Sequence, residues 1–93
     1  MTDLNTLTNE ELNTLFQKKS EEIKKIEEVS NEDKLILYKY YKQSTIGNIN
    51  IEKPGFLDFT GKAKYKAWEE VKDMTKDLCM KKYIQKVNEL VTK

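Results

Sequence analysis

The sequence predicts an all-α protein, a four-helix bundle with one long ordered connector between its second and third helices. One proline and three glycines are present, and all four lie within residues 47–61. Because these residues interrupt helices, their confinement to one segment predicts long helices on both sides of it. Apolar residues at helical spacing and Ser/Thr capping signals support the same fold. The length suits one core, so we expect a single domain over residues 1–93.

The first helix is predicted over residues 9–28. Thr8 and Glu11 have the spacing of a capping box, which opens a helix by satisfying free backbone N–H groups. The apolar stripe of this helix consists of Leu12, Leu15, Phe16, Ile23 and Ile26.

The second helix is predicted from an N-cap at Ser30 to about Ile46, with Gly47 as the residue that ends it. Its apolar and aromatic residues spread widely around the helix; they are Leu35, Ile36, Leu37, Tyr38, Tyr40 and Tyr41. A helix of this kind either packs on two sides or presents one side to a ligand.

Residues 47–60 form the predicted connector, with a turn at Lys53-Pro54-Gly55. Its apolar residues are Ile49, Ile51, Phe56, Leu57 and Phe59. This composition is too apolar for a free linker, so we expect the connector to be ordered and to fold back over the bundle.

The third helix is predicted over residues 61–72 with Thr60 as its cap, and the fourth over residues 76–92 after Thr75. The fourth helix has an apolar stripe of Met80, Tyr83, Ile84, Val87, Leu90 and Val91. Trp68 is expected in the core, and Cys79 is expected to be a small packed helix residue without a redox role.

Composition excludes several classes of function. Without histidine, the chain has no Ser-His or Cys-His nucleophile and no histidine metal site. With Cys79 as its single cysteine, it has no intrachain disulfide and no cysteine-cluster metal site. We therefore expect a binding protein with no metal and no cofactor. No run of about 18 apolar residues and no signal sequence at Met1–Asn9 are present, which predicts a cytoplasmic protein.

Positive charge is concentrated in the middle of the chain, although the net charge is only +1. Residues 34–68 contain seven lysines and two acidic residues, whereas residues 1–33 contain four lysines and nine acidic residues. Tyr38, Tyr41 and Lys42 share a helical face, and Lys64 follows on the next helix. An aromatic face for a base and an ammonium group for a phosphate suit a nucleotide ligand. Core packing of the aromatic residues is the alternative explanation.

The segments 37–50, 53–59, 61–68 and 83–87 resemble the acyl-CoA-binding protein family, and the match covers about residues 12–91. The resemblance implies a four-helix bundle that holds long-chain acyl-CoA esters in a shallow bowl without catalysis. It also implies the ligand-binding residues, which are Lys24, Tyr38, Lys39, Tyr40, Tyr41, Lys42, Lys64 and Tyr83. The sequence departs from the family at Tyr65, where a tryptophan is common, and at Thr60, where a lysine is frequent.

We expect a monomer that carries medium- to long-chain esters such as palmitoyl-CoA, without stable membrane insertion and without nucleic acid. Candidates to line the acyl chain, if they do not simply pack in the core, are Leu35, Ile36, Ile49, Ile51 and Leu57. The rival is a basic helical interaction module that binds nucleic acid or another nucleotide ligand. Against it stands the net charge, because nucleic-acid-binding domains usually have a strongly basic face. A hydrolase acting on acyl-CoA would lack a recognisable nucleophile and base.

Overall fold

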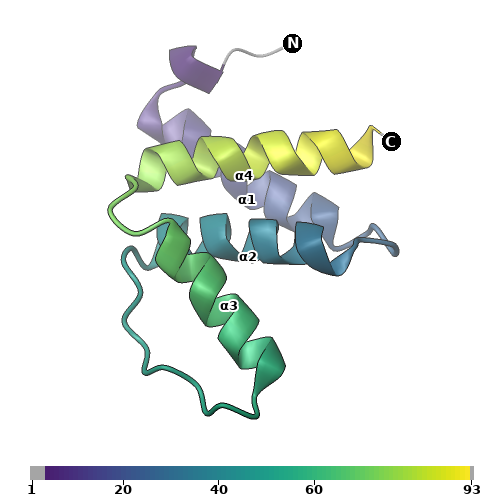
Figure 1. The fold of residues 1–93 in the computed structure, drawn as a ribbon. Helices are drawn as coiled ribbons and strands as arrows, with labels where there is room; N and C mark the ends of the chain where they lie inside the picture. Colours follow the sequence, from purple (N-terminus) through teal and green to yellow (C-terminus); the bar gives the residue numbers. More distant parts are fainter. Residues whose placement is uncertain (1–3, 93) are drawn as a thin grey trace.

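The computed structural model describes residues 4–92, which form a short 3-10 turn at Leu4–Thr6 and four α-helices (Figure 1). The helices are α1 (Asn9–Ile23), α2 (Asn31–Thr45), α3 (Phe59–Glu70) and α4 (Lys76–Val91). The all-α prediction is therefore confirmed. Residues 1–3 and 93 of the predicted domain lie outside the described range, and so does the beginning of the Met1–Asn9 segment.

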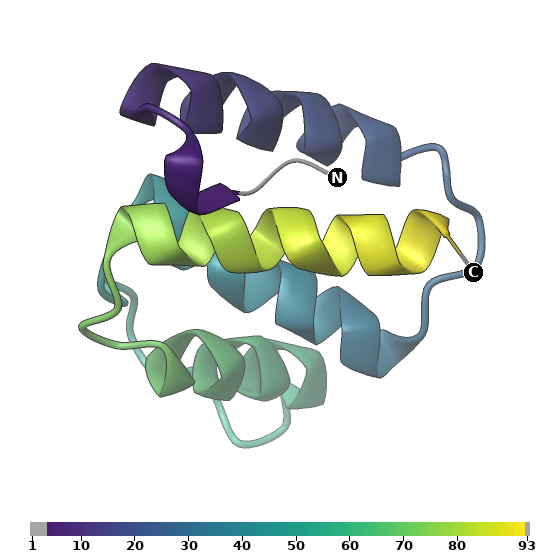
Figure 2. The ribbon, with the colours of Figure 1, turned by 90° about the horizontal axis from the view of Figure 1, so that it is seen from above.

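The main core lies between α1, α2 and α4. Figure 2 shows α4 between α1 and α2, and Figure 1 shows α3 against the other side of α2. The buried residues of this core are Leu12, Phe16, Leu37, Met80, Tyr83, Ile84, Val87 and Leu90. An ion pair between Lys86 Nζ and Asp33 Oδ1, 2.7 Å apart, ties α4 to the start of α2.

The predicted caps of α1, α2 and α4 are confirmed. Thr8 and Glu11 form both hydrogen bonds of the capping box, and Ser30 and Thr75 each accept a hydrogen bond from a backbone N–H of the first turn. Gly47 follows α2 with φ at +100°, a conformation that L side chains rarely adopt, which explains why a glycine ends this helix.

The predicted end of the first helix is wrong, because α1 stops at Ile23 instead of residue 28. The N–H groups of Lys25 and Ile26 bond three residues back, to Glu22 and Ile23, so the last turn tightens. Ile26 and Val29 then pack against the core from the following loop. The helical spacing of apolar residues predicted a longer helix, but burial of these two side chains in the core favours a loop here.

The predicted cap of the third helix is also wrong. Asp58, not Thr60, caps α3, because its Oδ1 accepts the N–H of Gly61 at 2.9 Å. A Cβ on Gly61 would lie 2.3 Å from Asp58 Oδ2, so the glycine makes room for this cap. The helix consequently begins at Phe59, and it ends at Glu70 instead of residue 72.

The connector does not fold back over the bundle as predicted. Figure 1 shows it as an open loop that leaves α2, extends away from the other helices and returns to α3. Its apolar side chains are largely in solvent: Ile51 is 47% exposed, Phe56 76%, Leu57 71% and Phe59 73%. Ile49 is half-buried.

The base of the connector is held by a hydrogen-bonded cluster around Gln43, whose side chain is buried. Gln43 Nε2 donates to Asn48 Oδ1 at 2.9 Å and to the carbonyl oxygen of Met74 at 3.0 Å. Trp68 Nε1 donates to Gln43 Oε1 at 3.2 Å and to the carbonyl oxygen of Gly47 at 2.9 Å. The end of α2, the start of the connector and the turn before α4 are thus joined through α3.

Candidate ligand-binding site

Two lysines from different helices meet on one tyrosine ring where α2 and α3 pack together. Lys42 Nζ lies 5.8 Å and Lys64 Nζ 5.5 Å from the centroid of the Tyr38 ring. Both distances fit a cation–π interaction. Tyr38 and Lys42 share a face because they are four residues apart on α2, and the packing of α3 on α2 brings Lys64 to them.

Trp68 packs against the ring of Tyr38. Its ring meets the Tyr38 ring edge-on, with centroids 6.5 Å apart and an interplanar angle of 87°. Lys42 Nζ also lies 5.8 Å from the Trp68 ring centroid. Trp68 is 1% exposed and its indole N–H is hydrogen-bonded. Its ring is therefore held in one position against the cluster of Tyr38, Lys42 and Lys64.

Two hollows adjoin the cluster, and Tyr38 and Lys34 line both of them. The larger, about 460 Å³, lies between α2 and α3 and is lined by Asn31, Lys34, Leu35, Tyr38, Phe59, Thr60, Ala63 and Lys64. The smaller, about 260 Å³, opens toward α1 and α4 and is lined by Ile23, Lys34, Leu37, Tyr38, Tyr41 and Tyr83. A ligand lying across Tyr38 could therefore occupy both hollows.

Tyr41 and Tyr83 line the smaller hollow beside Tyr38, and the Phe16 ring packs against both of them. Tyr41 stacks on Phe16 with centroids 5.6 Å apart, and Tyr83 lies 5.8 Å from Tyr41. Tyr41 is 41% exposed, whereas Phe16 and Tyr83 are buried. Burial, with a smaller effect of Tyr41, raises the pKa of Tyr83 to about 12. The phenol is therefore neutral at physiological pH and can donate a hydrogen bond.

The ammonium groups of the cluster have no carboxylate partner within the part of the chain that the structure describes. Among residues 4–92, neither Lys42 nor Lys64 forms an ion pair, although lysines on α1 and α4 do. Unneutralised cations beside aromatic faces and an apolar hollow suit a ligand with phosphate groups, a ring system and an apolar chain.

Comparison with known proteins identifies the family. The family model described as acyl-CoA-binding protein matches residues 13–87. The chain belongs to the acyl-CoA-binding protein family. A rice relative, acyl-CoA-binding domain-containing protein 3 from Oryza sativa subsp. japonica, is 43% identical over 76 residues, which cover 81% of this chain. The match spans only 49% of the rice protein. The acyl-CoA-binding protein homolog 1 of Caenorhabditis elegans is 45% identical over 69% of this chain and 74% of its own length.

Solved structures of acyl-CoA-binding proteins share the fold. The crystal structure of Oryza sativa acyl-CoA-binding protein 2 has a TM-score of 0.83 at 36% identity, covering 87% of this chain and 91% of that one. The crystal structure from Moniliophthora perniciosa has a TM-score of 0.81 at 35% identity, covering 86% of this chain and 80% of that one.

Not all of the residues that the acyl-CoA-binding protein resemblance implied come together. Lys39 Nζ lies 5.3 Å from the centroid of the Tyr40 ring. Tyr40 packs against the buried core instead, and burial, with smaller effects of Cys79 and Glu70, raises its pKa. Neither Lys39 nor Tyr40 lines a hollow beside Tyr38.

Lys24 is likewise absent from both hollows. It follows the last residue of α1, and its exposed ammonium group pairs with Glu21 at 3.2 Å. The neighbouring residue Ile23 lines the smaller hollow instead. A ligand role for Lys24 stays a prediction, and so do the roles of Lys39 and Tyr40.

Sequence reasoning missed Lys34, which lines both hollows. The available signal was its spacing, because Lys34, Tyr38 and Lys42 recur every four residues on one face of α2. Ala63 of α3 also lines the larger hollow. Of the acyl-chain candidates, Leu35 lines that hollow, whereas Ile36, Ile49, Ile51 and Leu57 do not.

Two other kinds of site have no counterpart in residues 4–92. No group of three or more Cys, Asp or Glu side chains there is placed to hold a metal ion. No helix in the same range has the length and apolar composition to cross a membrane.

Proposed function

We propose that the chain binds fatty acyl-CoA esters non-covalently and reversibly and serves as a cytoplasmic carrier of medium- to long-chain esters. The observation that carries this proposal is the convergence of Lys42 and Lys64 on the ring of Tyr38, between two hollows. The names of the relatives support the same ligand class. No bond is made or broken in this function.

Each part of the ligand has a complementary part of the site. The phosphate groups of coenzyme A fit the ammonium groups of Lys42 and Lys64, because charge-assisted hydrogen bonds are the strong ones. The adenine can stack on an aromatic face, which Tyr41 offers with its exposed ring. The acyl chain fits the larger hollow along Leu35, Ala63 and Phe59.

Native mass spectrometry with added hexadecanoyl-CoA tests the proposal directly. We expect a shift by the mass of one ligand, and no shift with an RNA or DNA oligonucleotide. An unchanged protein mass at ligand excess would refute acyl-CoA binding, and a shift with the oligonucleotide alone would favour the nucleic-acid rival.

Substitution of Lys64 by alanine is expected to weaken hexadecanoyl-CoA binding by about 1.5–3 kcal/mol, the range for a hydrogen bond to a charged group. Lys82→Ala removes an exposed lysine of α4 that lines neither hollow, and it serves as the matched control. Calorimetric titration measures both variants. If the 3′-phosphate is the partner, the loss shrinks with acyl-dephospho-CoA; equal losses with both ligands would assign Lys64 another role.

Substitution of Tyr38 by phenylalanine isolates the contribution of the hydroxyl group. The ring and its cation–π interactions remain, so we expect binding to weaken by about 0.5–1.5 kcal/mol from the lost hydrogen bond, at unchanged helix content. Tyr65→Phe removes the same hydroxyl group from a ring that lines a hollow on another side of α3. A Tyr38→Phe affinity within error of wild type would exclude a hydroxyl contact with the ligand.

A further inference from the structure

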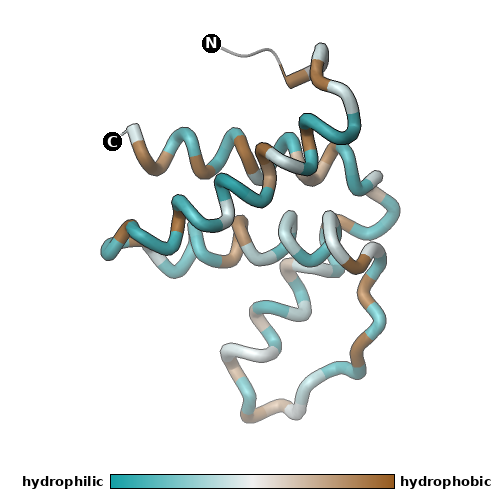
Figure 3. The backbone as a smooth tube through the Cα atoms, turned by 180° about the vertical axis from the view of Figure 1, so that it is seen from behind, coloured by the Kyte–Doolittle hydropathy of each residue, from teal (hydrophilic) through white to brown (hydrophobic). Residues whose placement is uncertain are grey.

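The most exposed large apolar side chains of residues 4–92 gather at the end of the connector. Phe56, Leu57 and Phe59 are all more than 70% exposed, and they lie within four consecutive residues. Figure 3 shows hydrophobic stretches along the loop that extends away from the bundle. We call Phe56, Leu57 and Phe59 the apolar tip. An exposed group of this kind usually marks an interaction surface.

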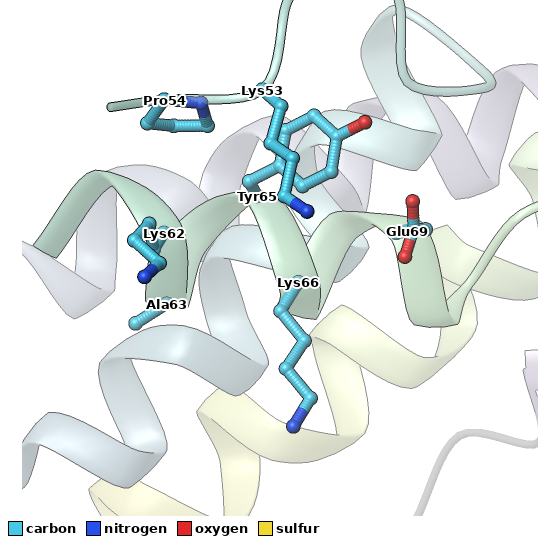
Figure 4. Close-up of a pocket in the computed structure, with 7 residues that line it drawn as sticks. All are labelled: Lys53, Pro54, Lys62, Ala63, Tyr65, Lys66 and Glu69. Atoms are coloured by element: carbon cyan, nitrogen blue, oxygen red, sulfur yellow. The ribbon is translucent and has the colours of Figure 1, made fainter. Parts of the chain in front are cut away.

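Positive charge surrounds the apolar tip. Residues 53–66 contain four lysines and one acidic residue, Asp58. The carboxylate of Asp58 is engaged as the cap of α3. Three lysines, Lys53, Lys62 and Lys66, and one acidic residue, Glu69, line a hollow of about 580 Å³ between the connector and α3. Figure 4 shows Lys53 and Pro54 of the connector opposite Lys62 and Tyr65 of α3.

The apolar tip and the three lysines Lys53, Lys62 and Lys66, which we call the lysine collar, together point to one kind of partner. We propose that this end of the molecule docks peripherally on an anionic lipid surface. Projecting aromatic and aliphatic side chains can enter the boundary between headgroups and acyl chains. Lysines behind them can remain at the headgroups and attract anionic lipids. The absence of a membrane-spanning helix among residues 4–92 fits a peripheral interaction.

The docking surface lies beside the proposed ligand site. Phe59 of the tip also lines the hollow between α2 and α3, next to Thr60 and Ala63. An acyl chain could therefore pass between the bilayer and this hollow with little exposure to water. The docking inference does not depend on acyl-CoA binding, because the ligand-free protein presents the same tip and collar.

Co-sedimentation of the ligand-free protein with vesicles tests the inference. We expect binding to vesicles of equal parts phosphatidylcholine and phosphatidylserine, and much weaker binding to phosphatidylcholine alone. Phe56→Ser/Leu57→Ser should lower the partition coefficient at least about tenfold, since binding scales with the apolar area buried. Leu78→Ser is the matched control, because Leu78 is 42% exposed on α4.

A second double variant tests the contribution of the lysine collar to vesicle binding. Lys53→Gln/Lys66→Gln should lower the partition coefficient by about twentyfold to thirtyfold, since each lysine near the surface contributes about fivefold. Lys72→Gln/Lys82→Gln removes the same charge from exposed positions that line no hollow beside the tip. Circular dichroism checks that each variant is folded.

Three results would overturn the inference. They are failure of wild type to sediment with the anionic vesicles, equal sedimentation with both lipid compositions, and unchanged sedimentation of the Phe56→Ser/Leu57→Ser variant. A further result would assign the apolar tip another role. If the Phe56→Ser/Leu57→Ser variant loses hexadecanoyl-CoA binding and the wild-type protein does not sediment with vesicles, the tip covers the bound ligand and does not dock on lipid. Failure of acyl-CoA binding itself would appear only in the ligand titrations, so the two proposals are separable.

Discussion

Hexadecanoyl-CoA is expected to bind at least about a hundredfold more tightly than octanoyl-CoA. A fully buried methylene contributes about 0.8 kcal/mol, so two of them would lower the dissociation constant by a little over tenfold. The hollow between α2 and α3 is open to solvent on the side of the exposed Phe59, and ordering of the chain also has a cost. Hexadecanoyl-CoA has eight more methylenes than octanoyl-CoA. If each contributes about half of the free energy of full burial, the binding free energy becomes more favourable by roughly 3 kcal/mol.

Calorimetric titration with octanoyl-, dodecanoyl- and hexadecanoyl-CoA measures this series, and a negative heat-capacity change should accompany it. Free coenzyme A retains the phosphates and should bind far more weakly than the long esters. Leu35→Ala should flatten the series, because Leu35 lines the larger hollow, while Leu78→Ala should leave it unchanged. A flat wild-type series would mean that the cluster around Tyr38 recognises a nucleotide alone.

Replacement of Trp68 by alanine is expected to lower the free energy of unfolding by about 3–5 kcal/mol. The side chain is almost completely buried, and its N–H donates to Gln43 Oε1 and to the carbonyl oxygen of Gly47. The substitution leaves a cavity and also two buried acceptors without this donor. Since small domains are stable by only about 5–15 kcal/mol, a large share of the total would be lost.

Urea unfolding followed by far-UV circular dichroism measures the effect, because the variant lacks the single tryptophan fluorophore. Trp68→Phe keeps an aromatic ring but removes the N–H, so it separates packing from hydrogen bonding. Leu78→Ala, on the exposed side of α4, is expected to change the free energy of unfolding by less than about 1 kcal/mol. A Trp68→Phe variant as stable as wild type would show that the two hydrogen bonds of the Trp68 N–H add nothing to stability.

Local signals in the sequence predicted most of the helices. Thr8, Ser30 and Thr75 stand directly before α1, α2 and α4, and Gly47 ends α2, because capping depends on a few neighbouring residues. The cap of α3 was misjudged because Asp58 and Thr60 are both capping residues. Only the contact with Gly61 distinguishes them.

Features that depend on tertiary packing were harder to predict. The sequence does not reveal that Ile26 turns into the core from a loop, or that Phe56 and Leu57 remain in solvent. For the site, spacing on α2 placed Tyr38 and Lys42 on one face. That Lys64 lies on the same ring depends on how α3 packs against α2, and for this residue the family resemblance supplied what spacing alone could not.

The attachment of α3 has a consequence for local unfolding. This helix packs mainly on α2, and the open connector before it contributes little burial. A region with few partners opens at a lower free energy than the global unfolding transition. A ligand held by Lys42 on α2 and by Lys64 on α3 would bridge the two helices and oppose this opening. In the empty protein we therefore expect the amide protons of α3 to exchange ahead of those of α2 and α4. We expect ligand binding to slow this exchange by a factor that grows with the ratio of ligand concentration to dissociation constant.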